Sequence, residues 1–207
     1  MNLIQRFMRF FFHLLYHPFA FTYDLVAATV SFGDWKNWVY SILPFINGTR
    51  LLELGHGPGH LQRLLRDRGL VAVAIDESTQ MGRIAKRRLG SSQKLTRALA
   101  QHIPFANKSF DTIVSTFPTD YIFQEPTLSE VKRCLSDGGR LIVLPAAFPK
   151  SGFLKWLYKI TGESPADLTE SIKKKIQQPF IEAGFRAEVE IVEVKSSRLL
   201  IVVAVKK

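Results

Sequence analysis

The chain has 207 residues, of which 46% are hydrophobic, and its formal net charge at pH 7 is +10. This length supports one domain with a sizeable core and leaves too little sequence for two ordinary domains. The single cysteine, Cys134, excludes an internal disulfide and favours a reducing cytoplasm. The basic balance favours anionic partners, but the sequence has no zinc-knuckle spacing and no recognised RNA-binding signature, so it disfavours nucleic acid.

Residues 1–22 are rich in aromatic and aliphatic side chains, with polar residues at spacings of three and four. The polar positions are Gln5, Arg6, Arg9, His13 and His17. They interrupt the run of roughly 20 apolar residues that a membrane-spanning helix requires, and Pro18 ends it. The pattern predicts a helix with a narrow polar stripe. Two compatible interpretations stay open: a lid over a ligand site, or a helix lying in a membrane interface.

Two further helices are predicted before the first strand. Residues 21–27 continue the helical pattern, and Ser31 to Asp34 end it and cap a helix over Trp35–Tyr40. We therefore predict an N-terminal helical lid or extension over residues 1–45, followed by one compact domain over residues 46–207.

The stretch from Leu51 to Leu61 predicts a strand, a tight loop and a helix. An apolar run carries Glu53 near its end and then breaks at three alternating glycines, which let a ligand lie directly on backbone N–H groups. The G-x-G-x-G order differs from the G-x-G-x-x-G dinucleotide fingerprint, and no Walker Lys-Ser/Thr follows. A carboxylate here would repel a pyrophosphate, but it suits a ligand that carries an ammonium and a sulfonium.

A second buried parallel strand is predicted over residues 70–75, ending at Asp76 and Glu77. Asp76 lies 21 positions after Gly55. That separation is near the ~20 expected for a carboxylate that accepts hydrogen bonds from ribose hydroxyls.

The rest of the chain continues the alternation of strands and helices. Strands are predicted over residues 94–99, 111–115, 141–144, 186–194 and 197–205, and helices over 125–135 and within 166–184. Residues 136–140 are predicted to turn. These elements predict a single α/β domain: a Rossmann-like, seven-stranded, mostly parallel sheet with helices on both faces, in which the last hairpin supplies the one antiparallel strand.

Three passages in this order resemble the class I S-adenosylmethionine-dependent methyltransferases. Residues 53–59 match that family's E/D-x-G-x-G-x-G motif at every fixed position. Residues 99–111 resemble its D-A-E-x-L-P-F-x-x-x-S-F-D passage, and residues 130–141 its E-x-x-R-x-L-K-P-G-G-x-L passage. Leading helices that carry a Tyr-Asp pair resemble the ubiquinone/menaquinone-type branch.

The resemblance implies a site for S-adenosylmethionine, with S-adenosylhomocysteine as product. It implies these cofactor-binding residues: Tyr23, Glu53, Gly55, His56, Gly57, Gly59, Asp76, Glu77, Met81, Ala100, Gln101 and Thr116. In the family, the tyrosine closes over the cofactor and the methionine lies against the adenine. Leu99 stands where many relatives carry an acid that contacts the adenine amino group. Losing one neutral hydrogen bond costs on the order of 1 kcal/mol, so we expect weaker binding rather than none.

The sequence says less about the residues that bind the methyl acceptor than about those that bind the cofactor. Thr116-Phe117-Pro118 lacks the Asn/Asp-Pro-Pro-aromatic motif of methyltransferases that act on the amino groups of nucleobases or glutamine. Asp120 and Tyr121 are the predicted substrate-pocket residues. His13 and His17 are candidate bases that the polar stripe also explains, so no catalytic residue is assigned. The histidines lack metal-ligand spacing, so no metal is expected.

The implied activity is methyl transfer to a small lipophilic acceptor, such as a quinone precursor or a phospholipid amine. This expectation includes a cytoplasmic protein in peripheral contact with an anionic membrane. Two alternatives stay open: methylation of a soluble small molecule or natural product, and a methyltransferase-like protein that binds a cofactor or partner without turnover. Only Leu99 points to the last.

Overall fold

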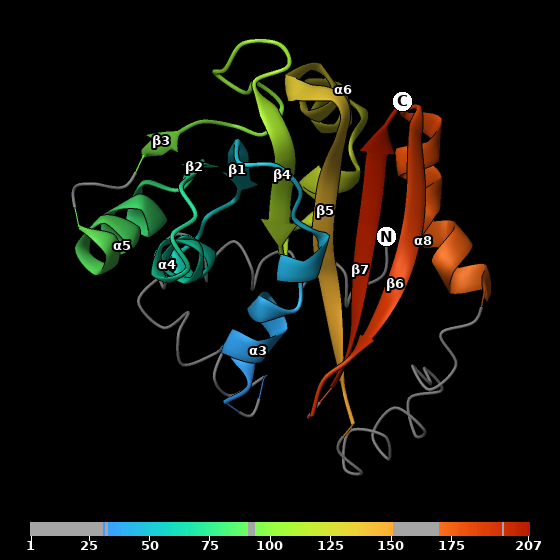
Figure 1. Ribbon diagram of the computed structural model, residues 1–207, viewed down its shortest axis with the longest axis horizontal. Coiled ribbons are helices and arrows are strands. Elements are labelled where there is room, and N and C mark those ends of the chain that lie inside the picture. The colour runs from blue at the N-terminus through green and yellow to red at the C-terminus, as the bar shows by residue number, and fades with distance from the viewer. Residues whose placement is uncertain (1–30, 32, 91–93, 151–169, 196) are drawn as a thin grey trace, which may run out of the picture.

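The computed structural model describes residue 31 and residues 33–90, 94–150, 170–195 and 197–207 (Figure 1). The helix predicted over residues 1–22, the helix predicted over 21–27 and Tyr23 lie outside these residues. The boundary between residues 45 and 46 therefore stays a prediction.

A seven-stranded sheet organises the molecule, in the order β3-β2-β1-β4-β5-β7-β6 (Figure 1). The strands are β1 (Leu51–Leu54), β2 (Ala72–Asp76), β3 (Leu95–Arg97), β4 (Phe110–Thr116), β5 (Leu135–Pro149), β6 (Phe185–Glu193) and β7 (Ser197–Lys206). The β7 strand pairs antiparallel with both β5 and β6, whereas the other pairs are parallel. This arrangement confirms the predicted fold class.

The helices and short 3-10 turns connect these strands. They are α3 (Trp35–Tyr40), η2 (Leu43–Phe45), α4 (His60–Asp67), α5 (Thr79–Leu89), η3 (Asp120–Phe123), α6 (Glu125–Cys134) and α8 (Glu170–Glu182). Because parallel strands place their carboxyl ends at one edge, the segments that follow β1, β2 and β4 meet there.

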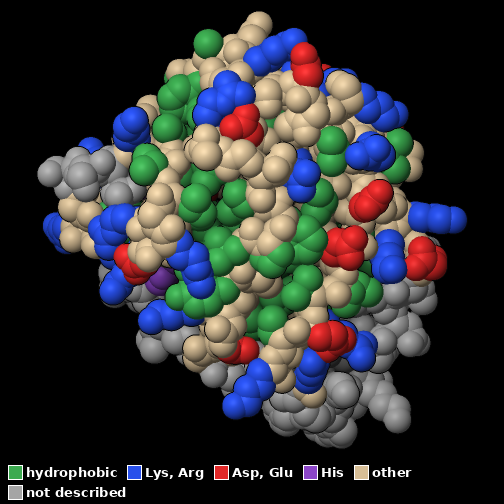
Figure 2. Space-filling model, in the orientation of Figure 1, with side chains coloured by type: hydrophobic (Ala, Val, Ile, Leu, Met, Phe, Trp, Pro, Cys, Tyr) green, Lys and Arg blue, Asp and Glu red, His purple; other side chains and the backbone are tan. Residues whose placement is uncertain are grey.

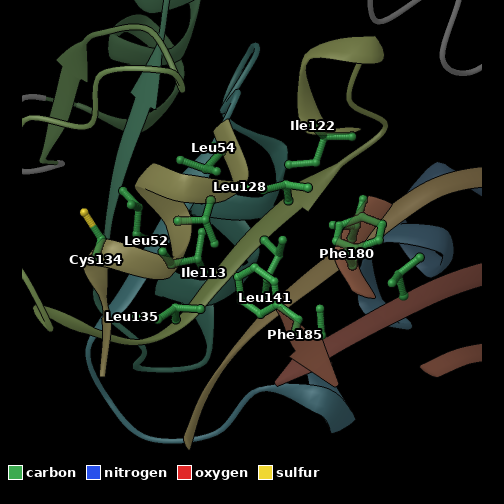
Figure 3. Packing of buried hydrophobic residues seen from close by; sticks show 14 of the residues in the cluster. Leu52, Leu54, Ile113, Ile122, Leu128, Cys134, Leu135, Leu141, Phe180 and Phe185 are labelled. Carbon is green, nitrogen blue, oxygen red and sulfur yellow. The ribbon is translucent and has the colours of Figure 1, made fainter. Parts of the chain in front are cut away.

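Alternate residues of the strands face two separate apolar layers. On one face, Leu52, Ile113 and Leu141 pack with side chains from α6 and α8, including Leu128 and Phe180 (Figure 3). Cys134 is fully buried in this layer.

The other apolar layer lies under α3 and α4. There, Leu51 and Val114 pack with Trp38, Leu61 and Leu65. Helix α3 therefore packs against the sheet through Trp38 and Val39.

Two predicted strands differ in length from the structure for reasons that the pairing explains. The fifth strand was predicted over four residues but spans Leu135–Pro149, with the predicted turn at 136–140 accommodated by a register shift against β4. Its extension past Leu144 follows from pairing with β7, which continues to Ser197. The third strand is shorter than predicted because only Leu95–Arg97 pair with β2.

Candidate functional site

The glycine loop, residues 55–59, bends between β1 and α4 through three left-handed glycines. The φ angles of Gly55, Gly57 and Gly59 are 71°, 50° and 85°. The Gly55 and His56 N–H groups donate to the Ile75 carbonyl at 2.8 and 3.2 Å. These bonds hold the loop over the carboxyl end of β2.

Each glycine has a different neighbour where a side chain would begin. A Cβ at Gly55 would lie 2.7 Å from the Tyr121 hydroxyl, and one at Gly59 would lie 2.8 Å from Leu89 Cδ1. Among the described residues, a Cβ at Gly57 would meet no atom within 4 Å, although this glycine is buried. The loop therefore has open space beside Gly57, where its backbone can approach a ligand.

Asp76 connects the glycine loop to the next helix. Its Oδ2 accepts from the Gly57 N–H and its Oδ1 accepts from the Ser78 N–H, both at 2.8 Å. Ser78 caps α5 by accepting from the Met81 N–H at 3.2 Å. Asp76 thus lies beside the loop at the tip of β2, as the spacing predicts, while its contact with a ribose stays a prediction.

The other predicted residues of this edge differ in burial. Met81 is fully buried, whereas Glu77 is exposed and its carbonyl accepts from Arg97 Nε at 3.0 Å. His56 is buried, and its Nδ1 lies 2.7 Å from the Gly57 carbonyl oxygen.

Glu53 is a buried carboxyl beneath the loop. Its side chain is 1% exposed, and its Oε2 accepts from Gln62 Nε2 at 2.8 Å. Burial raises the pKa of Glu53 to about 8; the Gln62 hydrogen bond opposes this shift and the nearby Asp76 charge adds to it. Sequence reasoning missed Gln62, although a polar residue among the inward-facing leucines of α4 is a usable signal.

The β3–β4 connection, residues 98–109, is held by α6. Glu130 accepts from the Ile103 N–H at 2.8 Å, and Arg133 donates to the carbonyls of Ile103 and Phe105 at 2.9 and 2.8 Å. The hydrogen bond from Arg133 lowers the pKa of Glu130. These contacts give a structural reason why the two sequence passages that contain residues 103–105 and residues 130–133 occur in the same chain.

The predicted adenine-side residues lie at the start of this connection. Leu99 is 46% exposed, so an open apolar side chain stands at the position where an acid would contact the adenine. Ala100 is half-buried, and Gln101 Nε2 donates to Gln124 Oε1 at 3.1 Å. Thr116 ends β4, paired with Leu144. Their roles toward a cofactor stay predictions.

The two predicted substrate-pocket residues face different surroundings. Tyr121 lies beneath the loop: its hydroxyl is 3.0 Å from Ser115 Oγ and donates to the Leu54 carbonyl at 3.3 Å. Asp120 is exposed at the first position of η3. Tyr121 therefore supports the loop in this structure, and a contact with substrate stays a prediction for both residues.

An aromatic cluster of Trp35, Trp38, Phe117 and His60 lies beside the start of α4. The ring centroids of Trp35 and Phe117 are 4.5 Å apart, and the Trp35 and His60 rings meet edge to face at 6.3 Å. Phe117 has a φ of 50°, a strained conformation of the kind that concentrates at functional sites. Sequence reasoning missed this cluster, because nothing in the sequence indicates a left-handed phenylalanine.

Comparisons with known proteins agree with this geometry. Residues 52–143 match the family model described as a methyltransferase domain. The chain is 28% identical over 159 residues to the ubiquinone/menaquinone biosynthesis C-methyltransferase UbiE of Blochmanniella floridana, covering 70% of this chain and 62% of that protein. It is 30% identical over 143 residues to demethylmenaquinone methyltransferase of Thermotoga maritima, covering 66% of this chain and 62% of that protein.

A solved structure shows the same fold. An S-adenosylmethionine-dependent methyltransferase of Thermotoga maritima superposes with a TM-score of 0.65 at 18% identity, covering 94% of this chain and 99% of that one. The chain spans about three fifths of the length of the two curated relatives. Residues 52–143 thus match a methyltransferase domain in sequence, and the chain has the fold of a solved S-adenosylmethionine-dependent methyltransferase.

Proposed function

We propose that the protein is a methyltransferase that binds S-adenosylmethionine at the glycine loop and methylates a small lipophilic acceptor. The observation that carries the cofactor assignment is the space beside Gly57, whose N–H donates to the Asp76 carboxylate. Glu53 would face the positive end of the cofactor, and Asp76 would accept from its ribose hydroxyls. The bound cofactor would supply an electrophilic methyl group.

The work of the chain is to orient this methyl group toward an acceptor and to exclude water. The aromatic cluster beside the loop supports an acceptor with an apolar, planar part, because ring faces stack on one another. Trp38 is buried, so the half-buried rings of Trp35 and Phe117 are the ones that would contact a quinone precursor or the tail of a phospholipid amine. The two curated relatives are themselves quinone-pathway methyltransferases by name.

The charge distribution supports contact with an anionic surface. Between residues 60 and 97 there are nine Lys or Arg and three Asp or Glu, a net charge of +6 of the chain's +10. Figure 2 shows Lys and Arg around the whole rim of the molecule, with fewer Asp and Glu among them on the side where α4 and α5 lie than on the opposite side. No helix among the described residues is both long and apolar enough to cross a bilayer. We therefore propose a cytoplasmic protein that meets an anionic membrane peripherally.

Calorimetric titration of S-adenosylmethionine and S-adenosylhomocysteine tests the cofactor site. We expect micromolar binding by the wild type and a loss of about tenfold or more in Asp76→Ala, because a charged hydrogen-bond acceptor is removed. Asp67→Ala, which removes an exposed charge from α4, is the matched control and should bind normally.

The outcomes of this titration separate the alternatives. Binding by the wild type justifies an acceptor screen that begins with quinone precursors and phosphatidylethanolamine and includes soluble amines and phenols. Absence of binding overturns the proposal and favours a methyltransferase-like protein that binds a partner without turnover, with Leu99 marking the altered pocket.

A further inference from the structure

Glu53 lies in an apolar layer rather than at an open surface. The strand register places it between Ala74 of β2 and Val114 of β4, and the inner face of α4 covers it. Among the described residues packed around it, Gln62 is the hydrogen-bonding side chain and Asp76 is the charged one. An ionised carboxylate in these surroundings loses its hydration and gains one hydrogen bond in return.

Gln62 has an unsatisfied atom of its own. Its side chain is 1% exposed, and its Oε1 has no hydrogen-bond partner among the described residues. Leaving a buried carbonyl oxygen without a donor is unfavourable, because the oxygen loses its hydrogen bonds to water and gains none in return. A protonated carboxyl has an O–H donor that an ionised carboxyl lacks. A proton on Glu53 would therefore provide the missing donor, and the acid and the amide would then exchange two hydrogen bonds.

The electrostatic surroundings act in the same direction. Burial is the main cause that raises the pKa of Glu53 to about 8, and the negative charge of Asp76 adds to it. On the opposite side of β1, β4 contributes the apolar Val114 at this level. The neutral form of Glu53 is thus favoured near pH 7 until a positive charge arrives beside it.

We propose that Glu53 is protonated and hydrogen-bonded to Gln62 in the ligand-free protein, and that binding of the cofactor's ammonium releases this proton. The inference rests on the cofactor site proposed above. The O–H bond of Glu53 breaks, the proton passes to water or buffer, and the carboxylate keeps the hydrogen bond from Gln62 Nε2. Gln62 is a positioning residue, because its amide can bond the carboxyl in both states.

Proton counting tests this proposal directly. S-adenosylhomocysteine is titrated into the full chain at pH 7 in two buffers of different ionisation enthalpy. Because the ligand's own amino group titrates near pH 8, the count is compared with that of Glu53→Gln, whose amide cannot release a proton. A pKa of about 8 predicts that the wild type releases about 0.9 proton more than this variant.

The role of Gln62 has a separate readout. Gln62→Met removes the amide that hydrogen-bonds the carboxyl in both protonation states, so the balance between these states changes and we expect the loss of affinity to differ between pH 7 and pH 9. A merely structural role would lower affinity equally at every pH. Gln178→Met, on the exposed side of α8, is the matched control and should leave the profile unchanged.

Each result decides something. Normal binding with equal proton counts for wild type and Glu53→Gln would overturn the proton release and leave the cofactor site standing. A pH-independent loss in Gln62→Met would overturn its positioning role. Absence of binding by the wild type would overturn the cofactor site itself, and the coupled proton with it.

Discussion

At the scale of single residues, the carboxyl of Glu53 makes stability depend on pH. Its pKa rises from 4.5 to about 8 on folding. Between these values the folded state binds more protons than the unfolded state. The stability that this group contributes is therefore fully present below pH 4.5 and is lost as the pH rises through 8.

Glu53→Gln should remove this loss of stability at high pH, because the glutamine amide does not ionise and can still hydrogen-bond with Gln62. We expect the variant to exceed the wild type in free energy of unfolding by on the order of 3 kcal/mol at pH 8, and by much less at pH 5. Urea denaturation at the two pH values measures the difference. A gap of the same size at both pH values would contradict the assigned ionisation.

Glu130 provides a control of opposite sign. The Arg133 hydrogen bond lowers the pKa of Glu130, so its contribution is present above its unfolded pKa and is lost as the pH falls through the folded value. Glu130→Gln should therefore destabilise the protein at both pH 5 and pH 8, whereas Glu53→Gln stabilises it most at pH 8.

At the scale of elements, two glycines of the same loop are needed for different reasons: we expect Gly55 to be needed for stability and Gly57 for ligand binding. Gly55→Ala would force a methyl group against the Tyr121 hydroxyl and disturb its bonds to Ser115 and Leu54. This clash and the strain of an alanine in a left-handed backbone should together lower the free energy of unfolding by about 2–3 kcal/mol. Adding Tyr121→Phe should recover part of it, and a double-mutant cycle measures that coupling.

Gly57→Ala should behave differently, because its new methyl group would enter open space. The expected stability loss is limited to the backbone strain of about 1–2 kcal/mol. The affinity for the cofactor should fall by more in Gly57→Ala than in the double variant that combines Gly55→Ala with Tyr121→Phe. The reason is that the methyl group added at residue 57 occupies the side of the loop that the ligand approaches. Wild-type affinity in Gly57→Ala would show that the ligand lies elsewhere.

The same elements show how far sequence reasoning reaches. Strand, loop and helix over residues 51–67 were predictable, because the glycines and the apolar periods are local signals. The length of β5 was not, because it depends on pairing with β7, about 50 residues later. The contacts of Gly55 with Tyr121 and of Glu53 with Gln62 depend on helix packing, and the left-handed Phe117 has no local cause in its sequence.

At the scale of the whole molecule, the charge asymmetry gives the membrane proposal its strongest physical basis. Helix α5 contains four Lys or Arg and no acid. Arg83, Lys86 and Arg87 are exposed and spaced by three and four residues, while Met81, Ala85 and Leu89 face inward. One exposed stripe of this helix is therefore available to anionic headgroups next to the glycine loop.

Replacing Arg83, Lys86 and Arg87 together by Gln should weaken binding to vesicles that contain phosphatidylglycerol. At about 1 kcal/mol per cation near the surface, the loss should be on the order of 3 kcal/mol, and it should shrink as salt is added. Replacing Lys174, Lys175 and Arg186 by Gln removes the same charge from α8 and β6 and should have little effect. Equal losses in the two triple variants would show that net charge, rather than the α5 surface, governs the association. Wild-type binding to pure phosphatidylcholine at the same strength would remove the electrostatic basis of the proposal, whereas selective loss in the α5 variant would place the glycine loop beside the bilayer that holds a lipophilic acceptor.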